Sequence, residues 1–229
     1  MAVDMDVALI VDVDGTLVDS AYEHVLAWSR AFRAHDVFVP SWRIHRAIGM
    51  GGDQLVPEVA GQDVEERLGD RIRDAEGDAY KEYLPHISAF PGANAFLERC
   101  REMGAQVVLA SSAKPSELDR YLELLDAERL GLRWTNSDDV SRTKPHPDLI
   151  HQALDQVPGA EALMIGDATW DVVAASRAGI PTLALLTGGY GEDELRAAGA
   201  LDVYPSLEEL TAALPEWLPS AAEASDTRR

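Results

Sequence analysis

Two aspartates, Asp12 and Asp14, stand at the end of an apolar run that predicts a buried strand over residues 7–12. Residues two apart on an extended chain face the same way, so both carboxylates are expected at the end of this strand. The consequence is a paired acid site, able to hold a cation or to move a proton. An Asp-x-Asp-Gly segment can also simply begin a turn at Gly15, so the choice between these interpretations depends on the rest of the chain.

A second acidic strand end follows later, where the apolar run 162–166 leads into Asp167 and, four residues on, Asp171. Carboxylates from two strands of one sheet suit a hard cation such as Mg²⁺, which prefers oxygen ligands and keeps several waters. Asp167 or Thr169 could also cap the following helix, a role that is compatible with metal binding by its neighbours. We therefore expect a magnesium site at these strand ends.

Ser111 and Lys144 are the candidates for binding an anion beside the carboxylates. Ser111 ends another apolar run and is followed by Ser112, Ala113 and a predicted helix. A hydroxyl group and successive backbone amides at a helix N-terminus favour a phosphate. Lys144 lies in a proline-bounded loop, where a lysine is often solvated. If it points inward instead, it supplies the cation that a site of several carboxylates and a phosphate requires.

Short β-branched runs that alternate with longer amphipathic stretches indicate an α/β protein with a doubly wound parallel sheet. Nearly continuous apolar strands are expected where helices cover both faces of the sheet. Ligands of such sheets gather at the carboxyl ends of the strands, which is where the polar residues above are placed. The predicted strands are residues 7–12, 106–111, 133–135, 162–166 and 181–185.

The segment between the first two strands predicts several successive helices and no βα alternation. An inserted all-helical cap subdomain is the simplest interpretation. We expect a core domain formed by residues 1–20 and 88–218, a cap formed by residues 21–87, and a disordered tail over residues 219–229. The helices predicted in the insertion are residues 22–35, 41–48, 52–59 and 64–84.

In their order along the chain, these motifs resemble the four motifs of the haloacid dehalogenase-like superfamily, whose core is a Rossmann-like fold. The match extends over nearly the whole chain, and the position of the insertion resembles the small helical cap of the phosphoglycolate phosphatase and β-phosphoglucomutase branch. The matching residues are Asp12-x-Asp14-Gly15-Thr16, Ser111, Lys144 and Gly166-Asp167-x-x-x-Asp171.

The resemblance implies hydrolysis of a phosphate monoester through an aspartyl-phosphate intermediate. Asp12 would be the nucleophile, while Asp14 would protonate the leaving oxygen and later take a proton from water. Mg²⁺ would be held by Asp12, the backbone carbonyl of Asp14 and Asp167, with Asp171 reaching it through water or steadying the other ligands.

The resemblance also implies how the substrate is bound. Ser111 and Lys144 would bind the phosphoryl oxygens and offset the charge that develops during transfer. The catalytic set is thus Asp12, Asp14, Ser111 and Lys144. The residues expected to bind substrate are Gly15, Thr16, His24, Ser112, Ala113 and Lys144.

Three other functions compete with a phosphatase. Dehalogenases lack the second aspartate, so Asp14 favours a phosphate ester. A sugar phosphomutase is closer, because Asp19, His24 and Trp28 resemble the β-phosphoglucomutase pattern, in which the histidine helps to gate the cap; His24 could equally be an ordinary half-buried helix residue. However, the predicted cap turn 49–54 contains no arginine to anchor a distal phosphate. A phospho-accepting or non-catalytic binding protein is the third alternative.

The composition limits the partners of this 229-residue chain. Its 40 acidic and 20 basic residues give a net charge of −20, which repels nucleic acids. A single cysteine, Cys100, fits a reducing compartment, and no apolar run approaches the length of a membrane span. Residues 1–6 contain no basic residue and do not predict a signal peptide. We expect a cytoplasmic protein that acts on a small phosphorylated metabolite.

Overall fold

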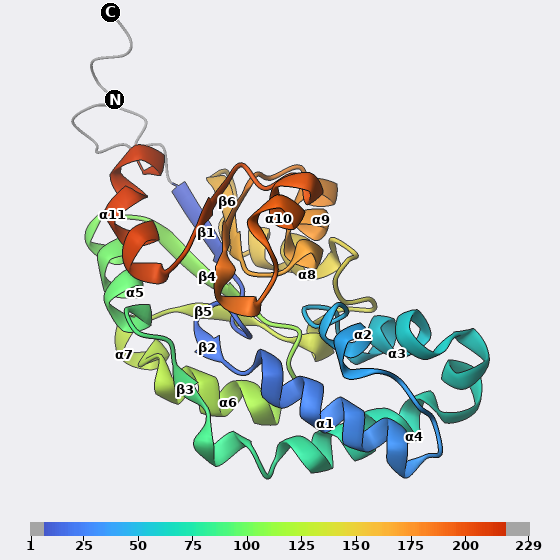
Figure 1. The fold of residues 1–229 in the computed structure, drawn as a ribbon. Coiled ribbons are helices and arrows are strands. Elements are labelled where there is room, and N and C mark those ends of the chain that lie inside the picture. The colour runs from blue at the N-terminus through green and yellow to red at the C-terminus, as the bar shows by residue number, and fades with distance from the viewer. Residues whose placement is uncertain (1–6, 219–229) are drawn as a thin grey trace, which may run out of the picture.

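The computed structural model describes residues 7–218 and contains a six-stranded, all-parallel sheet with helices on both faces (Figure 1). This confirms the predicted α/β, doubly wound fold and all five predicted strands. A sixth strand, at one edge, was not predicted. The tail 219–229, predicted to be disordered, lies outside the described residues, as do residues 1–6. The strand order is β5 (Arg133–Thr135), β4 (Gln106–Ala110), β1 (Val7–Val11), β6 (Glu161–Gly166), β7 (Thr182–Leu185) and β8 (Asp202–Tyr204).

The central strand β1 shows why these runs are apolar throughout. Leu9 and Val11 pack into the core on one face of the sheet, and Ala8 and Ile10 pack into the core on the other. Alternate side chains of a strand point to opposite faces, so a sheet covered on both sides needs apolar residues at every position. The helices of the first face include α5 (Ala93–Glu102), α6 (Pro115–Leu124), α7 (Ala127–Leu130) and α11 (Leu207–Trp217), and those of the second include α8 (Asp148–Leu154) and α9 (Thr169–Ala178).

The predicted helical insertion is present between two short strands, and its helices gather beside the sheet in Figure 1. They enclose a hydrophobic core of their own, which includes Phe32, Ile44 and Leu55. The two strands pair with each other where the chain leaves and re-enters the core, and the division at residues 20/21 and 87/88 stays a prediction. The elements are β2 (Val18–Asp19), α1 (Ala21–Ala34), α2 (Ser41–His45), α3 (Gly52–Ala60), α4 (Gln62–Tyr80) and β3 (Ser88–Ala89).

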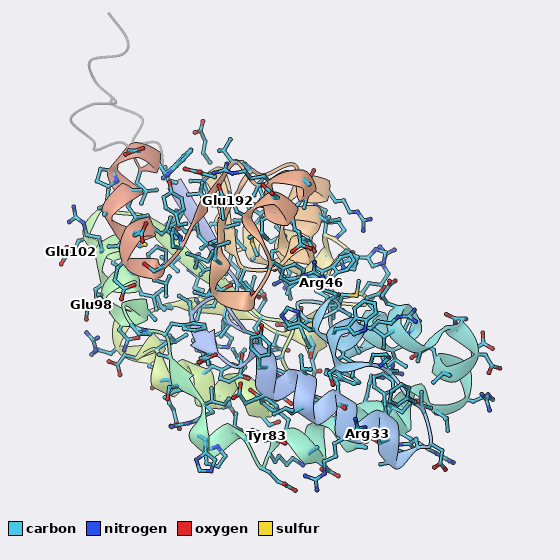
Figure 2. All side chains as sticks on the ribbon, in the orientation of Figure 1. Arg33, Arg46, Tyr83, Glu98, Glu102 and Glu192 are labelled. Carbon is cyan, nitrogen blue, oxygen red and sulfur yellow. The ribbon has the colours of Figure 1, made fainter. Side chains whose placement is uncertain are left out.

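Charged side chains cover the outside of the molecule, as Glu98, Glu102 and Glu192 illustrate in Figure 2. Cys100 is a residue of α5, and its free thiol is buried in the core. Within residues 7–218, no helix is both long enough and apolar enough to cross a membrane. The remaining elements are α10 (Glu192–Ala198) and three short 3₁₀ helices, η1 (Leu84–His86), η2 (Ser137–Asp139) and η3 (Leu186–Gly188).

Candidate active site

Three buried carboxylates meet at the carboxyl ends of the neighbouring strands β1 and β6. Asp12, Asp167 and Asp171 each offer an oxygen atom, and these oxygens all lie within 4.8 Å of one another. Asp12 follows β1 directly, and its backbone N–H donates to Ile165 O at 2.9 Å, which extends the pairing of the two strands. The parallel sheet therefore brings together acids that are 155 residues apart in sequence.

The backbone of two glycines, Gly15 and Gly188, lies so close to the Asp167 carboxylate that a side chain at either position would overlap it. Gly15 has φ +77°, and a Cβ atom there would lie 2.5 Å from Asp167 Oδ2. A Cβ atom at Gly188 would also overlap that oxygen. Thr16 Oγ1 donates a hydrogen bond to Asp167 Oδ1 at 2.6 Å. Glycine is needed at Gly15 for both its backbone conformation and this close approach.

Lys144 points inward and is completely buried, so it is not a solvated loop residue. Its Nζ atom forms ion pairs with Asp12 Oδ1 and, at 2.7 Å, with Asp171 Oδ1. It also donates to the carbonyl oxygen of Ala110 at 3.2 Å. Because the ammonium is shared by two acids, it holds Asp12 and Asp171 in fixed relative positions.

The negative charge of this cluster exceeds what Lys144 can neutralise. Burial raises the pKa of Asp12 to about 8, and repulsion from Asp171 adds to the effect of burial despite attraction by Lys144. Burial and the same repulsion raise the pKa of Asp167. Carboxylate oxygens in this number fit a divalent cation such as Mg²⁺, whose charge would favour the ionised acids.

Asp14 has partners different from those of the other acids. Its Oδ1 accepts a hydrogen bond from Ser20 Oγ at 2.7 Å and lies 3.3 Å from His24 Nε2. Its Oδ2 accepts from Ser111 Oγ at 3.3 Å. Although burial opposes ionisation, the hydrogen bond and charge of His24 lower the pKa of Asp14. The Asp14 carboxylate therefore faces the cavity and His24, whereas Asp12 faces Lys144.

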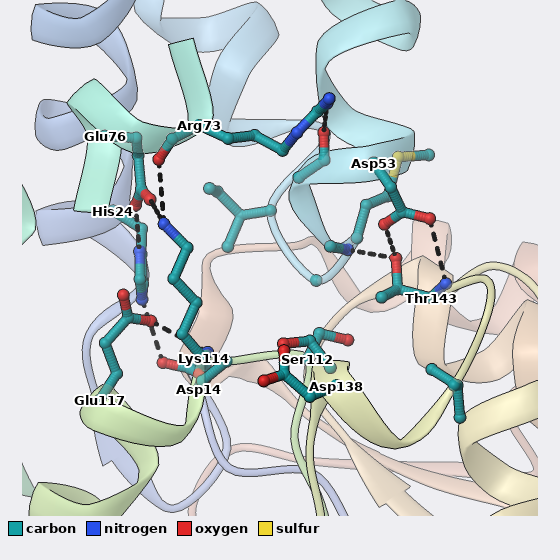
Figure 3. Close-up of a pocket in the computed structure, with 18 of the residues that line it drawn as sticks. Asp14, His24, Asp53, Arg73, Glu76, Ser112, Lys114, Glu117, Asp138 and Thr143 are labelled. Atoms are coloured by element: carbon teal, nitrogen blue, oxygen red, sulfur yellow. Dashed lines mark hydrogen bonds and ion pairs between the residues drawn. The ribbon is translucent and has the colours of Figure 1, made fainter. Parts of the chain in front are cut away.

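His24 connects Asp14 to the cap. Its Nδ1 lies 3.0 Å from Glu76 Oε1 on α4, and its ring is stacked on Tyr80 with the centroids 3.8 Å apart. Figure 3 shows Glu76, His24 and Asp14 in succession along one wall of the cavity. Burial would lower the pKa of His24, but hydrogen bonds to Asp14 and Glu76 outweigh it and raise this pKa well above its ordinary value. Glu76 belongs to none of the sequence motifs described above.

The predicted phosphate-binding turn lies where β4 meets α6. Ser111 Oγ accepts a hydrogen bond from Ala113 N at 3.0 Å, which orders the turn. The Ser112 hydroxyl is buried without a hydrogen-bond partner among residues 7–218, and Ser112 lines the cavity. Lys114 differs from its neighbours because its Nζ turns towards the cap, where it donates to Arg73 O at 2.9 Å.

A cavity of about 300 Å³ lies between the core and the helical insertion, next to Asp12 and Asp14. Among the residues of the insertion, Met50 and Arg73 line it, whereas Trp42 is 70% exposed. The lining residues from α1, α3, α4 and the turn 48–51 are His24, Trp28, Ile48, Gly49, Met50, Gly51, Gly52, Asp53, Arg73 and Glu76, and the remainder are Asp12, Asp14, Ser112, Ala113, Lys114, Glu117, Ser137, Asp138, Val140, Ser141 and Thr143.

One contact across the cavity joins the turn before α3 to the loop that carries Lys144. Asp53 accepts a hydrogen bond from Thr143 Oγ1, and its Oδ2 accepts from Thr143 N at 3.2 Å. Gly51 N donates to Thr143 Oγ1 at 3.0 Å (Figure 3). No motif signalled this contact, because neither Asp53 nor Thr143 lies at a predicted strand end.

Known proteins that resemble this chain include hydrolases and phosphatases. A family model described as haloacid dehalogenase-like hydrolase matches residues 7–179. The chain is 31% identical to a phosphoglycolate phosphatase of Cupriavidus necator, over 94% of this chain and 96% of that protein, and 30% identical to one of Rhodobacter capsulatus, over 83% and 88%. The crystal structure of a hydrolase from Pseudomonas syringae superposes with a TM-score of 0.87 at 36% identity, covering 92% of this chain and 99% of that one.

Proposed function

The chain belongs to the family of haloacid dehalogenase-like hydrolases, and from this membership we propose that it hydrolyses a small phosphate monoester through an aspartyl-phosphate intermediate. The observation that carries the proposal is the position of Asp12. It shares a buried ammonium with Asp171, lies close to Asp167 and opens onto a cavity that also contains Asp14.

Asp12 and Asp14 divide the chemistry between them. An oxygen of Asp12 attacks phosphorus, and the bond between phosphorus and the ester oxygen breaks as the aspartyl-phosphate forms. The departing oxygen takes a proton from Asp14, which receives that proton beforehand from His24, 3.3 Å away. Water then attacks phosphorus and gives a proton to the Asp14 carboxylate. The bond between phosphorus and the Asp12 oxygen breaks, so Asp12 becomes a free carboxylate again.

The metal proposal rests on the three clustered acids. Asp12, Asp167 and the backbone carbonyl of Asp14 would hold Mg²⁺, and Asp171, paired with Lys144, would keep the other ligands in place. When bound, Mg²⁺ supplies positive charge to the phosphoryl oxygens.

The transferred phosphoryl group is proposed to lie against the turn after β4. Ser111, the backbone amides of Ser112 and Ala113, and Lys144 supply donors there. These groups are held before substrate arrives, since Ser111 is fixed by Ala113 N and Lys144 by two carboxylates. Such preorganised donors stabilise charge as it develops. The backbone of Gly15 and Thr16 would complete this binding site on the side of β1.

A hydrolase is favoured over a phosphomutase by the charges opposite Asp12. A mutase must hold a second phosphate there while the intermediate turns over. The turn 49–54 contributes Asp53 and no arginine, and Arg73 of α4 is occupied by ion pairs with Glu65 and Asp70. Incubation with β-glucose 1-phosphate, Mg²⁺ and a trace of the 1,6-bisphosphate tests the choice, because glucose 6-phosphate formed faster than free phosphate would indicate a mutase.

Phosphate release from p-nitrophenyl phosphate tests the proposed function itself. We expect release that requires Mg²⁺ and is abolished by Asp12→Asn. Absence of release from the wild-type protein would favour the alternative of a phospho-accepting or binding protein.

A cytoplasmic location is part of the proposal, supported by the free thiol of Cys100. The net charge of −20 supports a small phosphorylated metabolite, and no nucleic acid, as the partner.

A further inference from the structure

We propose that the alcohol released from the substrate carries hydroxyl or ammonium groups and no carboxylate, so that the substrate is a phosphorylated polyol or amino alcohol and not a phosphorylated hydroxy acid. The proposal deepens the proposed function and rests on it. It follows from the walls of the cavity beyond Asp12 and Asp14, where the leaving group must lie.

These walls are rich in hydrogen-bond acceptors. Asp53 of α3, Glu76 of α4, Glu117 of α6 and Asp138 of η2 all line the cavity, in addition to the two aspartates after β1. An ionised carboxylate only accepts hydrogen bonds, whereas hydroxyl and ammonium groups donate them. A ligand rich in such donors finds partners here, and a ligand carboxylate meets further acceptors.

Arg73 lines the cavity, but its guanidinium group is already engaged. It forms a two-pronged ion pair with Glu65, with N–O distances of 2.8 and 2.9 Å, and donates to Asp70 Oδ1 at 2.8 Å. A further bond of 3.2 Å reaches the carbonyl oxygen of Gly52. Two-pronged pairs of arginine and carboxylate are among the stronger interactions of their kind. A substrate anion would have to displace Glu65 to gain this cation.

Lys114 and His24 are likewise held by acids. The ammonium of Lys114 donates to Arg73 O and lies 3.7 Å from Glu76 Oε2. Figure 3 marks both contacts. The His24 ring lies between Asp14 and Glu76. Each cationic or basic side chain that lines the cavity within residues 7–218 therefore has a carboxylate partner, and the six lining carboxylates outnumber them.

The raised pKa of Glu117 is consistent with an excess of negative charge around the cavity. Its side chain is buried, and burial together with repulsion from Glu76 and Asp14 raises its pKa to about 7 despite attraction by His24. An additional carboxylate brought in by a substrate would be repelled by this wall. Unmatched like charge is one means by which a binding site rejects the wrong ligand.

Two series of substrates, each comparing an acidic leaving group with an uncharged and an amino one, test the proposal. The first is phosphoglycolate, 2-hydroxyethyl phosphate and phosphoethanolamine. The second is 6-phosphogluconate, glucose 6-phosphate and glucosamine 6-phosphate. In at least one series we expect kcat/KM for the acid to lie at least tenfold below that for the uncharged or amino compound, which corresponds to about 1.4 kcal/mol of transition-state binding.

The variant Glu65→Gln gives a second test, because it releases Arg73 into the cavity. The remaining partners are the carbonyl oxygen of Gly52, 3.2 Å away, and Asp70, which is 96% exposed and holds the guanidinium weakly. We expect the ratio of kcat/KM for the acid to that for the uncharged compound to rise at least threefold. Glu66→Gln is the matched control, since it makes the same change of charge at an exposed neighbour on α4 and should leave the ratio unchanged.

Hydrolysis of p-nitrophenyl phosphate distinguishes failure of the inference about the leaving group from failure of the proposed phosphatase function. If the protein releases phosphate from this ester but prefers the acid in either series, or hydrolyses none of the six compounds, the inference about the leaving group is overturned while the proposed function stands. If it does not hydrolyse the aryl ester or any of the six compounds, the proposed function fails as well. An unchanged ratio in Glu65→Gln would contradict the assigned role of Arg73.

Discussion

Lys144 Nζ lies 2.7 Å from Asp171 Oδ1, and both side chains are completely buried at the carboxyl ends of the central strands. The same ammonium also contacts Asp12, so a single cation joins the proposed nucleophile to the helix that follows β6. Loss of one partner from a buried ion pair leaves the other charge uncompensated. This arrangement gives Lys144 a structural role in addition to its proposed catalytic role.

We therefore predict that Lys144→Met destabilises the protein by about 3–5 kcal/mol, the usual effect of breaking a buried pair, and abolishes turnover. Urea unfolding of the wild type and variant measures the loss. Lys81→Met is the matched control. Lys81 pairs with Asp78 at 2.8 Å, but both side chains are more than two-thirds exposed, so we expect a change below about 1 kcal/mol. Equal destabilisation by the two variants would contradict the prediction.

Asp12→Asn should remove turnover while the fold persists. The amide cannot form the acyl phosphate, and a neutral side chain avoids the burial of charge, and the repulsion from Asp171, that raise the pKa of Asp12. We expect kcat to fall more than about a hundredfold, equivalent to about 3 kcal/mol of barrier, with an unchanged circular dichroism spectrum. Retention of more than about a hundredth of wild-type kcat would show that Asp12 is not the nucleophile.

Magnesium should stabilise the folded protein through the acid cluster. A ligand that binds only the folded state at a hundred times its Kd adds about 2.7 kcal/mol of stability, so Tm should rise with Mg²⁺ concentration. Asp167→Ala should weaken this rise and increase the Mg²⁺ needed for activity, whereas Asp63→Ala on the exposed surface of α4 should do neither. Calcium should raise Tm without supporting turnover, because its looser coordination misplaces the reacting groups. Full activity in excess chelator would exclude the metal.

The ends of the strands could be predicted from the sequence, because a strand that is buried on both faces of the sheet is an uninterrupted apolar run. β1 and, from Ala162 onwards, β6 are continuous apolar runs followed at once by acids, and in a parallel sheet such ends meet at one edge. Strand β8 was missed because its three residues at the edge of the sheet are only partly buried and form no apolar run. Strands β2 and β3, of two residues each, are defined only by their pairing with each other.

The cap side of the cavity could not be predicted in the same way. Arg73 and Glu76 are three residues apart on α4 and share a face of the helix, which the sequence period can indicate. Whether that face meets solvent, another helix or the core depends on how the insertion lies against the sheet. Periodicity does not contain this information, so Glu76 emerged as the partner of His24 only in the structure.

His24→Ala should lower kcat more than it raises KM. His24 lies 3.3 Å from Asp14 and is held by Glu76, so its loss removes a group that acts on Asp14 during proton transfer and leaves the phosphate-binding turn intact. Glu76→Gln, which retains the shape and hydrogen-bonding capacity of Glu76, should show the same pattern with a smaller loss. Steady-state kinetics with p-nitrophenyl phosphate measure both. A rise in KM with unchanged kcat would instead assign His24 to substrate binding.

Glu117 should make the stability of the protein depend on pH. Its pKa in the folded protein is about 7, against 4.5 for the ordinary side chain, chiefly because of burial. Between these values the folded state binds more protons than the unfolded state, so the stability contributed by neutral Glu117 is complete below about pH 4.5 and is lost as the pH rises to about 7. The loss amounts to at most about 3 kcal/mol. Glu117→Gln, which can still accept the 3.4 Å hydrogen bond from Lys114 N, removes this penalty.

We therefore expect Glu117→Gln to match the wild type in unfolding free energy near pH 4.5 and to exceed it at pH 8. Urea unfolding of both proteins at the two pH values measures the difference. Glu123→Gln is the control on the same helix, because Glu123 is 71% exposed and should give a difference that does not change with pH. If the gain of Glu117→Gln were equal at the two pH values, Glu117 would be ionised in the folded protein throughout, and its pKa would not be raised by burial.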